Sequence, residues 1–329
     1  MVGRVIVGVV GLSLSAEERD ALSSHELLGV ILFSRNYQDK KQLSELIDSI
    51  KSINPSLLIF VDQEGAIWRF ERGFYRIPIA NYFGDCYDRH GEKVACEETR
   101  SSAYVMAKEL KDVGVDVTIA PVLDVHNNQS TIIGQRGRAF HENPDVVSVL
   151  GKAFIEGLNE AGCPAVIKHF PGHGSAHGDT HINQVVDERS WEELEACDVK
   201  PFKTLLSSGV AQAVMVAHVL YPAVDDNLAG FSKPWIDILR GYSKDACVLT
   251  DCLGMAGVGQ WSDHDKCQHA IEAGCDVLVY SNQIYREEKT GLAAVVPKPI
   301  PEVLEAVSSI PDSEESRARR AGLLSKRYS

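Results

Sequence analysis

The sequence predicts an α/β protein that folds as a single (β/α)₈ barrel of the TIM type over residues 1–329. Short, β-branched runs of apolar residues alternate along the chain with patterns typical of helices. Eight such runs occur in 329 residues, which suits a fold whose usual size is about 250 residues plus insertions. A doubly wound open sheet is the alternative, but no G-x-G-x-x-G motif follows the first run.

The eight predicted strands are near-continuously apolar, as expected of parallel strands that are covered on both faces. They span residues 5–11, 29–33, 57–62, 115–124, 165–169, 213–218, 247–251 and 276–282. The first run follows one arginine and superficially resembles a signal peptide. We favour a core strand, because the run is short and β-branched and a charged helix start follows it.

Helical spacing of apolar residues separates these runs. In the segment 39–53, Leu43, Leu46, Ile47 and Ile50 recur at the spacing of one helix face. Asn143 followed by Pro144 is typical of a helix start. The other predicted helices span residues 92–113, 143–161, 191–208, 262–273 and 300–309. From about residue 312 we expect a charged helical tail, and we expect one catalytic domain throughout.

Composition narrows the class of function. Hydrophobic residues make up 44% of the chain, which allows a sizeable core, and the net charge of −13 disfavours nucleic-acid binding. No run approaches the ~18 apolar residues of a membrane span. The eight cysteines are scattered without a C-x-x-C motif, which favours reduced thiols over the disulfides of a secreted protein. We therefore expect a soluble, cytoplasmic monomer that acts on a small molecule.

Polar residues end five of the predicted strands, at the barrel rim where active sites of this fold lie. They are Asp62, Asp124, the pair Lys168 and His169, His218 and Asp251. Each residue alone could simply cap the next turn. Five at equivalent positions predict one shared polar pocket.

The loop 168–181, KHFPGHGSAHGDTH, is the strongest chemical signal in the chain. Its histidines and aspartate, His173, His177, Asp179 and His181, could in principle bind zinc, but they lack the helical spacing of an H-E-x-x-H site. We therefore predict no metal and no cofactor. A carboxylate two residues away can fix the tautomer of His181 and raise its basicity, which predicts proton transfer by Asp179 and His181.

Asp251 ends a strand and is a candidate nucleophile. Glycoside cleavage with retention needs a nucleophile and an acid/base, roles that Asp251 and His181 could fill. Asp62 is a good acceptor for sugar hydroxyls, while Arg69 and Lys168 are donors. A capping aspartate at 251 and a structural ion pair between Asp62 and Arg69 are the alternatives.

The motif KHFPGHG followed by Asp179, Thr180 and His181 resembles the loop of family 3 glycoside hydrolases of the β-N-acetylglucosaminidase (NagZ) type. Further stretches resemble the same family in the same order, from about residue 5 to residue 285. They lie at residues 28–36, 61–65, 119–125, 137–140, 214–222, 250–255 and 273–279. The length of the loop motif and the ordered set make a chance resemblance improbable.

The resemblance implies a single TIM-type barrel and assigns roles to individual residues. Asp251 would be the nucleophile of a glycosyl-enzyme intermediate, and His181 the acid/base that Asp179 orients. Six positions match substrate-binding residues of the family: Asp62, Arg69, Arg138, Lys168, His169 and Met255. Of these, Met255 would lie beside the nucleophile. Bacterial members remove N-acetylglucosamine from 1,6-anhydro-N-acetylmuramic acid fragments of peptidoglycan during cytoplasmic recycling.

The chain departs from the family pattern beside these positions. The stretch after D-Q-E-G is one residue shorter and places Trp68 before Arg69, which predicts an altered pocket rim. The usual D-D-L-S-M reads D-C-L-G-M here, so Cys252 replaces a second carboxylate. The segment 133–140 offers Arg136 as well as Arg138, of which Arg138 fits the R-A-F pattern.

Three other functions compete with a β-N-acetylhexosaminidase. A β-glucosidase-like member would need a second domain, for which the chain has no room. A phosphorylase is compatible with a neutral histidine acid/base, because it repels phosphate less than a carboxylate does. A non-catalytic sugar-binding barrel would explain the altered segments, but Asp179, His181 and Asp251 are retained.

Overall fold

The computed structural model describes residues 2–127, 130–286 and 293–325. Each of the eight predicted runs overlaps a strand, so the predicted α/β class with parallel sheets is confirmed. The strands are β1 (Val5–Gly8), β2 (Leu27–Leu32), β3 (Leu58–Val61), β4 (Val117–Thr118), β5 (Ile167–Phe170), β7 (Ala213–Val216), β9 (Cys247–Thr250) and β10 (Leu278–Tyr280).

These strands form two parallel sheets, in the orders β10-β1-β2-β3-β4 and β5-β7-β9. Isolated parallel bridges join the sheets at two places. Thr118 bridges Ala165 between β4 and β5, and Leu249 bridges Val277 between β9 and β10. Because neighbours run parallel, the residues that follow β3, β5, β9 and β10 reach the same rim.

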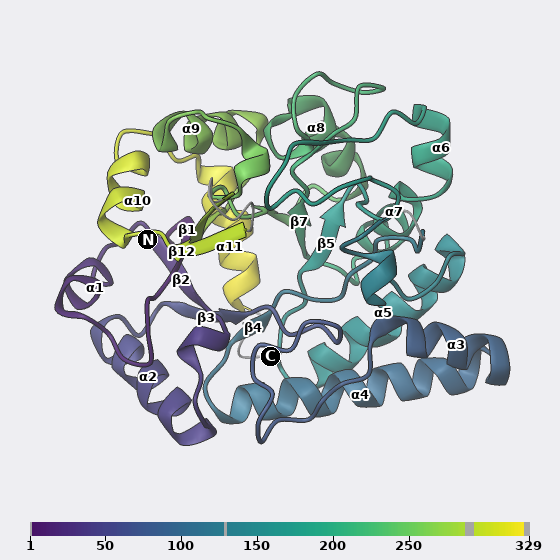
Figure 1. Cartoon of the computed structure of the whole chain (residues 1–329), viewed down its shortest axis with the longest axis horizontal. Helices are drawn as coiled ribbons and strands as arrows, with labels where there is room; N and C mark the ends of the chain where they lie inside the picture. The colour runs from purple at the N-terminus through teal and green to yellow at the C-terminus, as the bar shows by residue number, and fades with distance from the viewer. Residues whose placement is uncertain (1, 128–129, 287–292, 326–329) are drawn as a thin grey trace.

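The helices lie around the strands in Figure 1. They are α1 (Ala16–Ala21), α2 (Lys40–Ile53), α3 (Ala80–His90), α4 (Glu92–Asp112), α5 (Pro144–Glu160), α6 (Trp191–Ala196), α7 (Val199–Ser207), α8 (Lys233–Tyr242), α9 (Asp263–Ala273), α10 (Ile300–Val307) and α11 (Glu314–Ser325). The predicted spacing in α2 is confirmed, because Leu43, Leu46, Ile47 and Ile50 are its buried residues and Asp39 caps its start. One continuous apolar core runs between helices and strands.

The prediction of one helix over residues 191–208 was wrong. The chain breaks at Cys197, whose φ of −116° and ψ of −81° are not helical, and α6 and α7 lie on either side. A proline ring clashes with the carbonyl group four residues earlier in a continuous helix, and Pro201 stands four residues after Cys197. The proline sits in the first turn of α7, where its missing N–H costs little.

Sequence reasoning also missed α3, α8 and an antiparallel hairpin. The hairpin joins β11 (Asn282–Arg286) to β12 (Ala293–Pro297) and stands between β10 and α10. A second pair of short strands, β6 (Val185–Val186) and β8 (Val219–Leu220), runs parallel.

The C-terminal helix α11 is anchored to the body of the protein. Arg320 is fully buried and donates to the carbonyl groups of Val2 and Asp276, just before β1 and β10, and to the carboxylate of Asp312. The helix therefore lies under the amino ends of these strands, opposite the rim that carries the polar residues. None of the helices in the described residues is long and apolar enough to span a membrane.

Candidate active site

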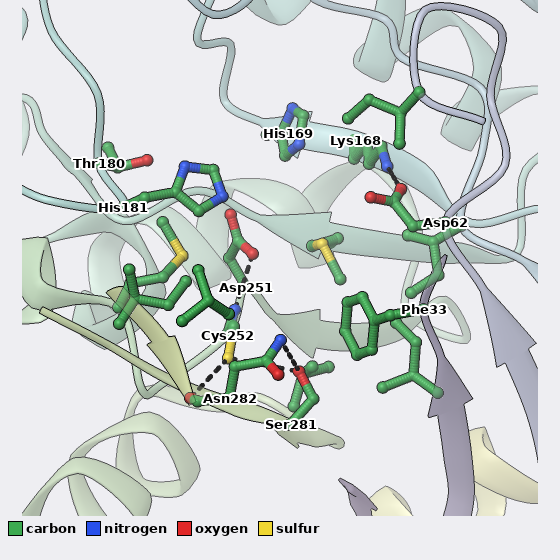
Figure 2. Close-up of a pocket in the computed structure, with 18 of the residues that line it drawn as sticks. Phe33, Asp62, Lys168, His169, Thr180, His181, Asp251, Cys252, Ser281 and Asn282 are labelled. Atoms are coloured by element: carbon green, nitrogen blue, oxygen red, sulfur yellow. Dashed lines mark hydrogen bonds and ion pairs between the residues drawn. The ribbon is translucent and has the colours of Figure 1, made fainter. Parts of the chain in front are cut away.

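A cavity of about 430 Å³ opens at the carboxyl ends of the strands (Figure 2). Eight of the nine predicted site residues line it: Asp62, Arg69, Arg138, Lys168, His169, His181, Asp251 and Met255. The ninth, Asp179, hydrogen-bonds to His181. The fold therefore brings together residues that are up to 193 positions apart in the chain (from Asp62 to Met255).

One side of the cavity is a buried ionic cluster. The Lys168 ammonium group contacts the carboxylates of both Asp62 and Glu64, the latter at 2.6 Å between Nζ and Oε2. Arg138 forms a two-point ion pair with Glu64, and Arg69 donates to Asp62 at 2.9 Å. These five residues present three cationic and two anionic groups.

Mutual pairing keeps this cluster ionised. Burial alone raises the pKa of the Glu64 carboxyl group, but Arg138 and Lys168 outweigh it and hold that pKa below its usual value. Burial opposes ionisation of Asp62 too, and Lys168 and Arg69 lower its pKa well below the ordinary range. The charged donors and acceptors are therefore fixed before any ligand enters.

Lys168 and His169 follow each other in β5, joined by a cis peptide bond. The imidazole of His169 is held by Asp124, with 2.7 Å between Nδ1 and Oδ2. The same carboxylate accepts the backbone N–H groups of His169 and His173, at 3.2 and 2.8 Å. Burial raises the pKa of the Asp124 carboxyl group, but its interactions with His169 and His173 outweigh burial and lower that pKa. Asp124 thus fixes the ring that His169 presents to the cavity.

Asp251 follows β9 directly and stands at the centre of the cavity in Figure 2. Its backbone N–H donates to the Val216 carbonyl at 3.0 Å, and its Oδ1 accepts the Cys252 N–H at 2.7 Å. Burial raises the pKa of the Asp251 carboxyl group, but nearby histidines and the Cys252 N–H outweigh it. The histidines are His169, His218 and His181. The carboxylate is therefore ionised at neutral pH, as a nucleophile requires.

His181 projects toward Asp251 from the end of the loop (Figure 2). Its Nδ1 lies 2.6 Å from Oδ1 of Asp179, which also accepts the His181 backbone N–H at 2.9 Å. The hydrogen bond to His181 lowers the pKa of Asp179 to about 2. The carboxylate can therefore orient the ring and stabilise its protonated form, which is the geometry of a general acid/base.

Backbone hydrogen bonds dock this loop beside the nucleophile. The N–H groups of Ala256 and Gly257, in the short helix η4 (Ala256–Val258), donate to the carbonyl groups of His181 and Thr180 at 3.0 and 3.1 Å. A Cβ atom at Gly257 would lie 2.3 Å from the Thr180 oxygen. Only glycine permits this close approach.

The structure places only one of the two candidate arginines in the cavity. Arg138 is buried in the cavity wall, whereas Arg136 is exposed in the short helix η2 (Gly134–Arg136). Trp68 donates to the Ile77 carbonyl and does not itself line the cavity, whereas its neighbours Ile67 and Arg69 do, so its effect on the rim stays a prediction. Cys252 does line it.

Sequence reasoning gave Glu64 no role and did not assign Phe33, Ser281 or Asn282 to the cavity. Glu64 lies in the D-Q-E-G stretch, where a second carboxylate three residues after a buried strand was the available signal. No group of three or more metal-binding side chains that could hold an ion occurs among residues 2–127, 130–286 and 293–325. A metal-free reaction stays a prediction.

Comparison with known proteins places the chain among glycosidases. Residues 4–313 match the glycosyl hydrolase family 3 N-terminal domain. A β-hexosaminidase of Nitrosomonas eutropha is 41% identical over 285 residues, covering 85% of this chain and 81% of that protein. One from Shewanella frigidimarina is 43% identical over 286 residues, covering 84% and 82%.

Solved structures agree with these relatives. NagZ from Neisseria gonorrhoeae in complex with N-trifluoroacetyl-D-glucosamine is 34% identical, with a TM-score of 0.86 over 98% of this chain and 90% of that chain. The same protein with a zinc ion gives a TM-score of 0.84 at the same identity and coverage. The chain therefore belongs to glycosyl hydrolase family 3 and is a glycoside hydrolase of the NagZ type.

Proposed function

We propose that the protein is a retaining β-N-acetylhexosaminidase that releases terminal N-acetylglucosamine through a covalent glycosyl-enzyme intermediate. The observation that carries the proposal is one cavity that holds an ionised Asp251 beside a histidine paired with a carboxylate. These are the two functions that retention requires, with histidine in place of the usual second carboxylate. The gonococcal NagZ bound to an N-acylglucosamine supports the choice of sugar.

In the first step, an oxygen of Asp251 attacks the anomeric carbon and forms the carbon–oxygen bond to the enzyme. The bond to the leaving group breaks, and protonated His181 gives its proton to the departing oxygen. In the second step, neutral His181 takes a proton from water, and the water oxygen displaces Asp251 from the anomeric carbon. Asp179 positions His181 in both steps.

The buried ionic cluster suits the binding of sugar hydroxyl groups. Ionised donors and acceptors form short, directional hydrogen bonds to hydroxyls, and Asp62, Lys168 and Arg138 offer both kinds at fixed positions. His169, held by Asp124, adds a further polar contact. Met255 is buried beside the nucleophile and supplies an apolar contact.

We further propose that the parallel strands close into one (β/α)₈ barrel and that one such domain acts as a monomer. The parallel bridges from β4 to β5 and from β9 to β10 support closure. As substrates we propose N-acetylglucosaminyl-1,6-anhydro-N-acetylmuramic acid fragments, hydrolysed in the cytoplasm during peptidoglycan recycling. The β-hexosaminidase and NagZ relatives support the sugar class.

Turnover of a chromogenic N-acetyl-β-glucosaminide by purified protein tests the proposal, with Asp251→Ala as the control. We expect release of free N-acetylglucosamine as the β-anomer, whether or not phosphate is present, and no release by the variant. Sugar 1-phosphate as the main product would instead identify a phosphorylase. A folded protein that turns over no glycoside would exclude catalysis.

A further inference from the structure

The hairpin β11–β12 turns one apolar face toward the cavity. Ile284 and Val295 are directly opposite each other in its register, so their side chains share a face, and both line the cavity. The neighbouring pair, Gln283 and Val296, faces the other way and does not line the cavity. Ile284 is buried, but Val295 remains 55% exposed. The cavity therefore has an uncovered apolar wall.

The hairpin is fixed to the segment that carries the nucleophile. The Ile284 N–H donates to the Gly254 carbonyl at 2.7 Å, and the Cys252 thiol donates to the Asn282 carbonyl at 3.5 Å. A Cβ atom at Gly254 would lie 1.7 Å from that same carbonyl oxygen. The residues at 252 and 254 are the two that depart from D-D-L-S-M. A carboxylate at 252 would face a carbonyl oxygen, and a serine at 254 would collide with it.

The chain that follows the nucleophile, including η4, places the hairpin on the leaving-group side of the cavity. The loop that carries His181 docks on η4 through Ala256 and Gly257, and β11 packs against η4 as well. An acid/base faces the glycosidic oxygen, so the group attached to that oxygen must pass beside His181. The ionic cluster of Asp62 and Lys168 lies across the cavity in Figure 2. The leaving group is therefore bordered by His181 and the hairpin.

We propose that Ile284 and Val295 form an aglycone subsite that selects leaving groups with an apolar face, such as alkyl or aryl groups, over fully hydroxylated ones. This inference rests on the proposed N-acetyl-β-glucosaminidase activity and adds the chemical feature of the leaving group that the cavity recognises. A leaving group that covers Val295 removes apolar surface from water at both partners, which favours its binding in the transition state. No contact with the N-acetylglucosamine unit is needed.

Methyl and n-hexyl N-acetyl-β-glucosaminides provide the test, because their alcohols have similar acidity and differ in apolar area. In the wild type we expect kcat/KM for the hexyl glycoside to exceed that for the methyl glycoside by roughly tenfold, the effect of two buried methylene groups. Val295→Asp should bring the hexyl-to-methyl ratio to about one, because burying the alkyl chain would then also bury an unpaired charge.

Val296→Asp is the matched control, since it adds the same charge to the opposite face of the same strand. It should keep the wild-type ratio. Val295→Ser, a smaller change at an exposed position, guards against misfolding and should lower the ratio in the same direction. Hydrolysis of both glycosides with an unchanged ratio in Val295→Asp and Val295→Ser would overturn the subsite alone. If the wild type hydrolyses neither glycoside, the proposed function fails together with the subsite.

Discussion

The two sides of the cavity are built in opposite ways. At the centre of the ionic cluster, the side chains of Glu64, Arg138 and Lys168 are 1%, 6% and 3% exposed, while those of Asp62 and Arg69 are 16% and 28% exposed. In the proton-transfer pair, the side chains of His181 and Asp179 are 47% and 28% exposed. The ionic cluster joins residues that follow β3 and η2 to Lys168 in β5. The pair of His181 and Asp179 belongs to a single loop, which backbone hydrogen bonds dock on η4.

Because of this difference in burial, we expect the ionic cluster to contribute to stability and the proton-transfer pair to contribute to catalysis. Buried ion pairs hold distant parts of the chain together, and the loss of one partner leaves an uncompensated charge. An exposed pair stabilises the fold little, but it can exchange protons with solvent between the two steps of the reaction. We therefore expect variants of the cluster to lose stability and activity together, and variants of the pair to lose activity alone.

The largest effect is expected for Glu64→Ala. It leaves Arg138 without its carboxylate partner and Lys168 with Asp62 alone, and it should lower the free energy of unfolding by about 3–5 kcal/mol, with loss of activity. Urea denaturation measures the change. Glu97→Ala is the matched control, because that carboxylate pairs with Arg100 on the surface and should contribute less than about 1 kcal/mol. Equal losses in the two variants would contradict the distinction.

His181→Ala comes next. It should lower kcat/KM by about 10²–10⁴-fold for alkyl glycosides, because a general acid is lost, and much less for activated aryl glycosides. The free energy of unfolding should stay within about 0.5 kcal/mol of the wild type. Asp179→Asn should show a weaker version of the same pattern. Equal losses for poor and activated leaving groups would count against the acid role.

Gly257→Ala tests the docking of the loop without touching either side chain. The new Cβ would meet the Thr180 and Asn183 carbonyl oxygens at 2.3 and 2.4 Å. The loop must shift, and a displacement of this size can lower the rate by about 10²-fold. Gly241→Ala is the control, because nothing lies within 4 Å of its added Cβ. If the kinetics of Gly257→Ala match those of the control, docking does not contribute.

The smallest effect at neutral pH concerns His173, which lies in the same loop but is buried. Burial lowers the pKa of His173 from 6.5 to about 4. Between pH 6.5 and pH 4, this histidine is therefore more protonated in the unfolded chain than in the folded protein. As the pH falls from 6.5 toward 4, His173 therefore lowers the free energy of unfolding by up to about 3 kcal/mol. Above pH 6.5 the contribution vanishes.

Unfolding of His173→Asn across this range measures the contribution. Its stability should fall less steeply with decreasing pH than that of the wild type. His25→Asn, at a side chain that is 70% exposed, should follow the wild-type curve. Parallel curves for all three proteins would show that burial of His173 does not govern the pH dependence.

Local pattern was enough to predict the strands and most of the polar rim. Apolar runs and strand-end positions identified Asp62, His169 and Asp251, because side-chain position at a strand end follows from the strand itself. The partners of these residues were harder to predict. Glu64 acquires its role from Arg138, 74 positions away, a pairing that no local pattern encodes.

The elements that were missed depend on tertiary contact. The hairpin β11–β12 contains polar and charged residues, and its apolar face is defined only by what it packs against. The departures at Cys252 and Gly254 were visible in the sequence, but their reason is the Asn282 carbonyl, which reaches them through the fold. The break at Cys197 was readable from Pro201 alone.

The proposed mechanism requires that Asp251 becomes covalently bonded to the sugar. Incubation with a 5-fluoro analogue of N-acetylglucosaminyl fluoride slows the second step, so that the intermediate accumulates, and peptide mass spectrometry then locates it. We predict one sugar per chain, attached to the peptide that contains Asp251 and absent from Asp251→Ala. A sugar attached to any other residue, or fluoride release without attachment, would contradict the account.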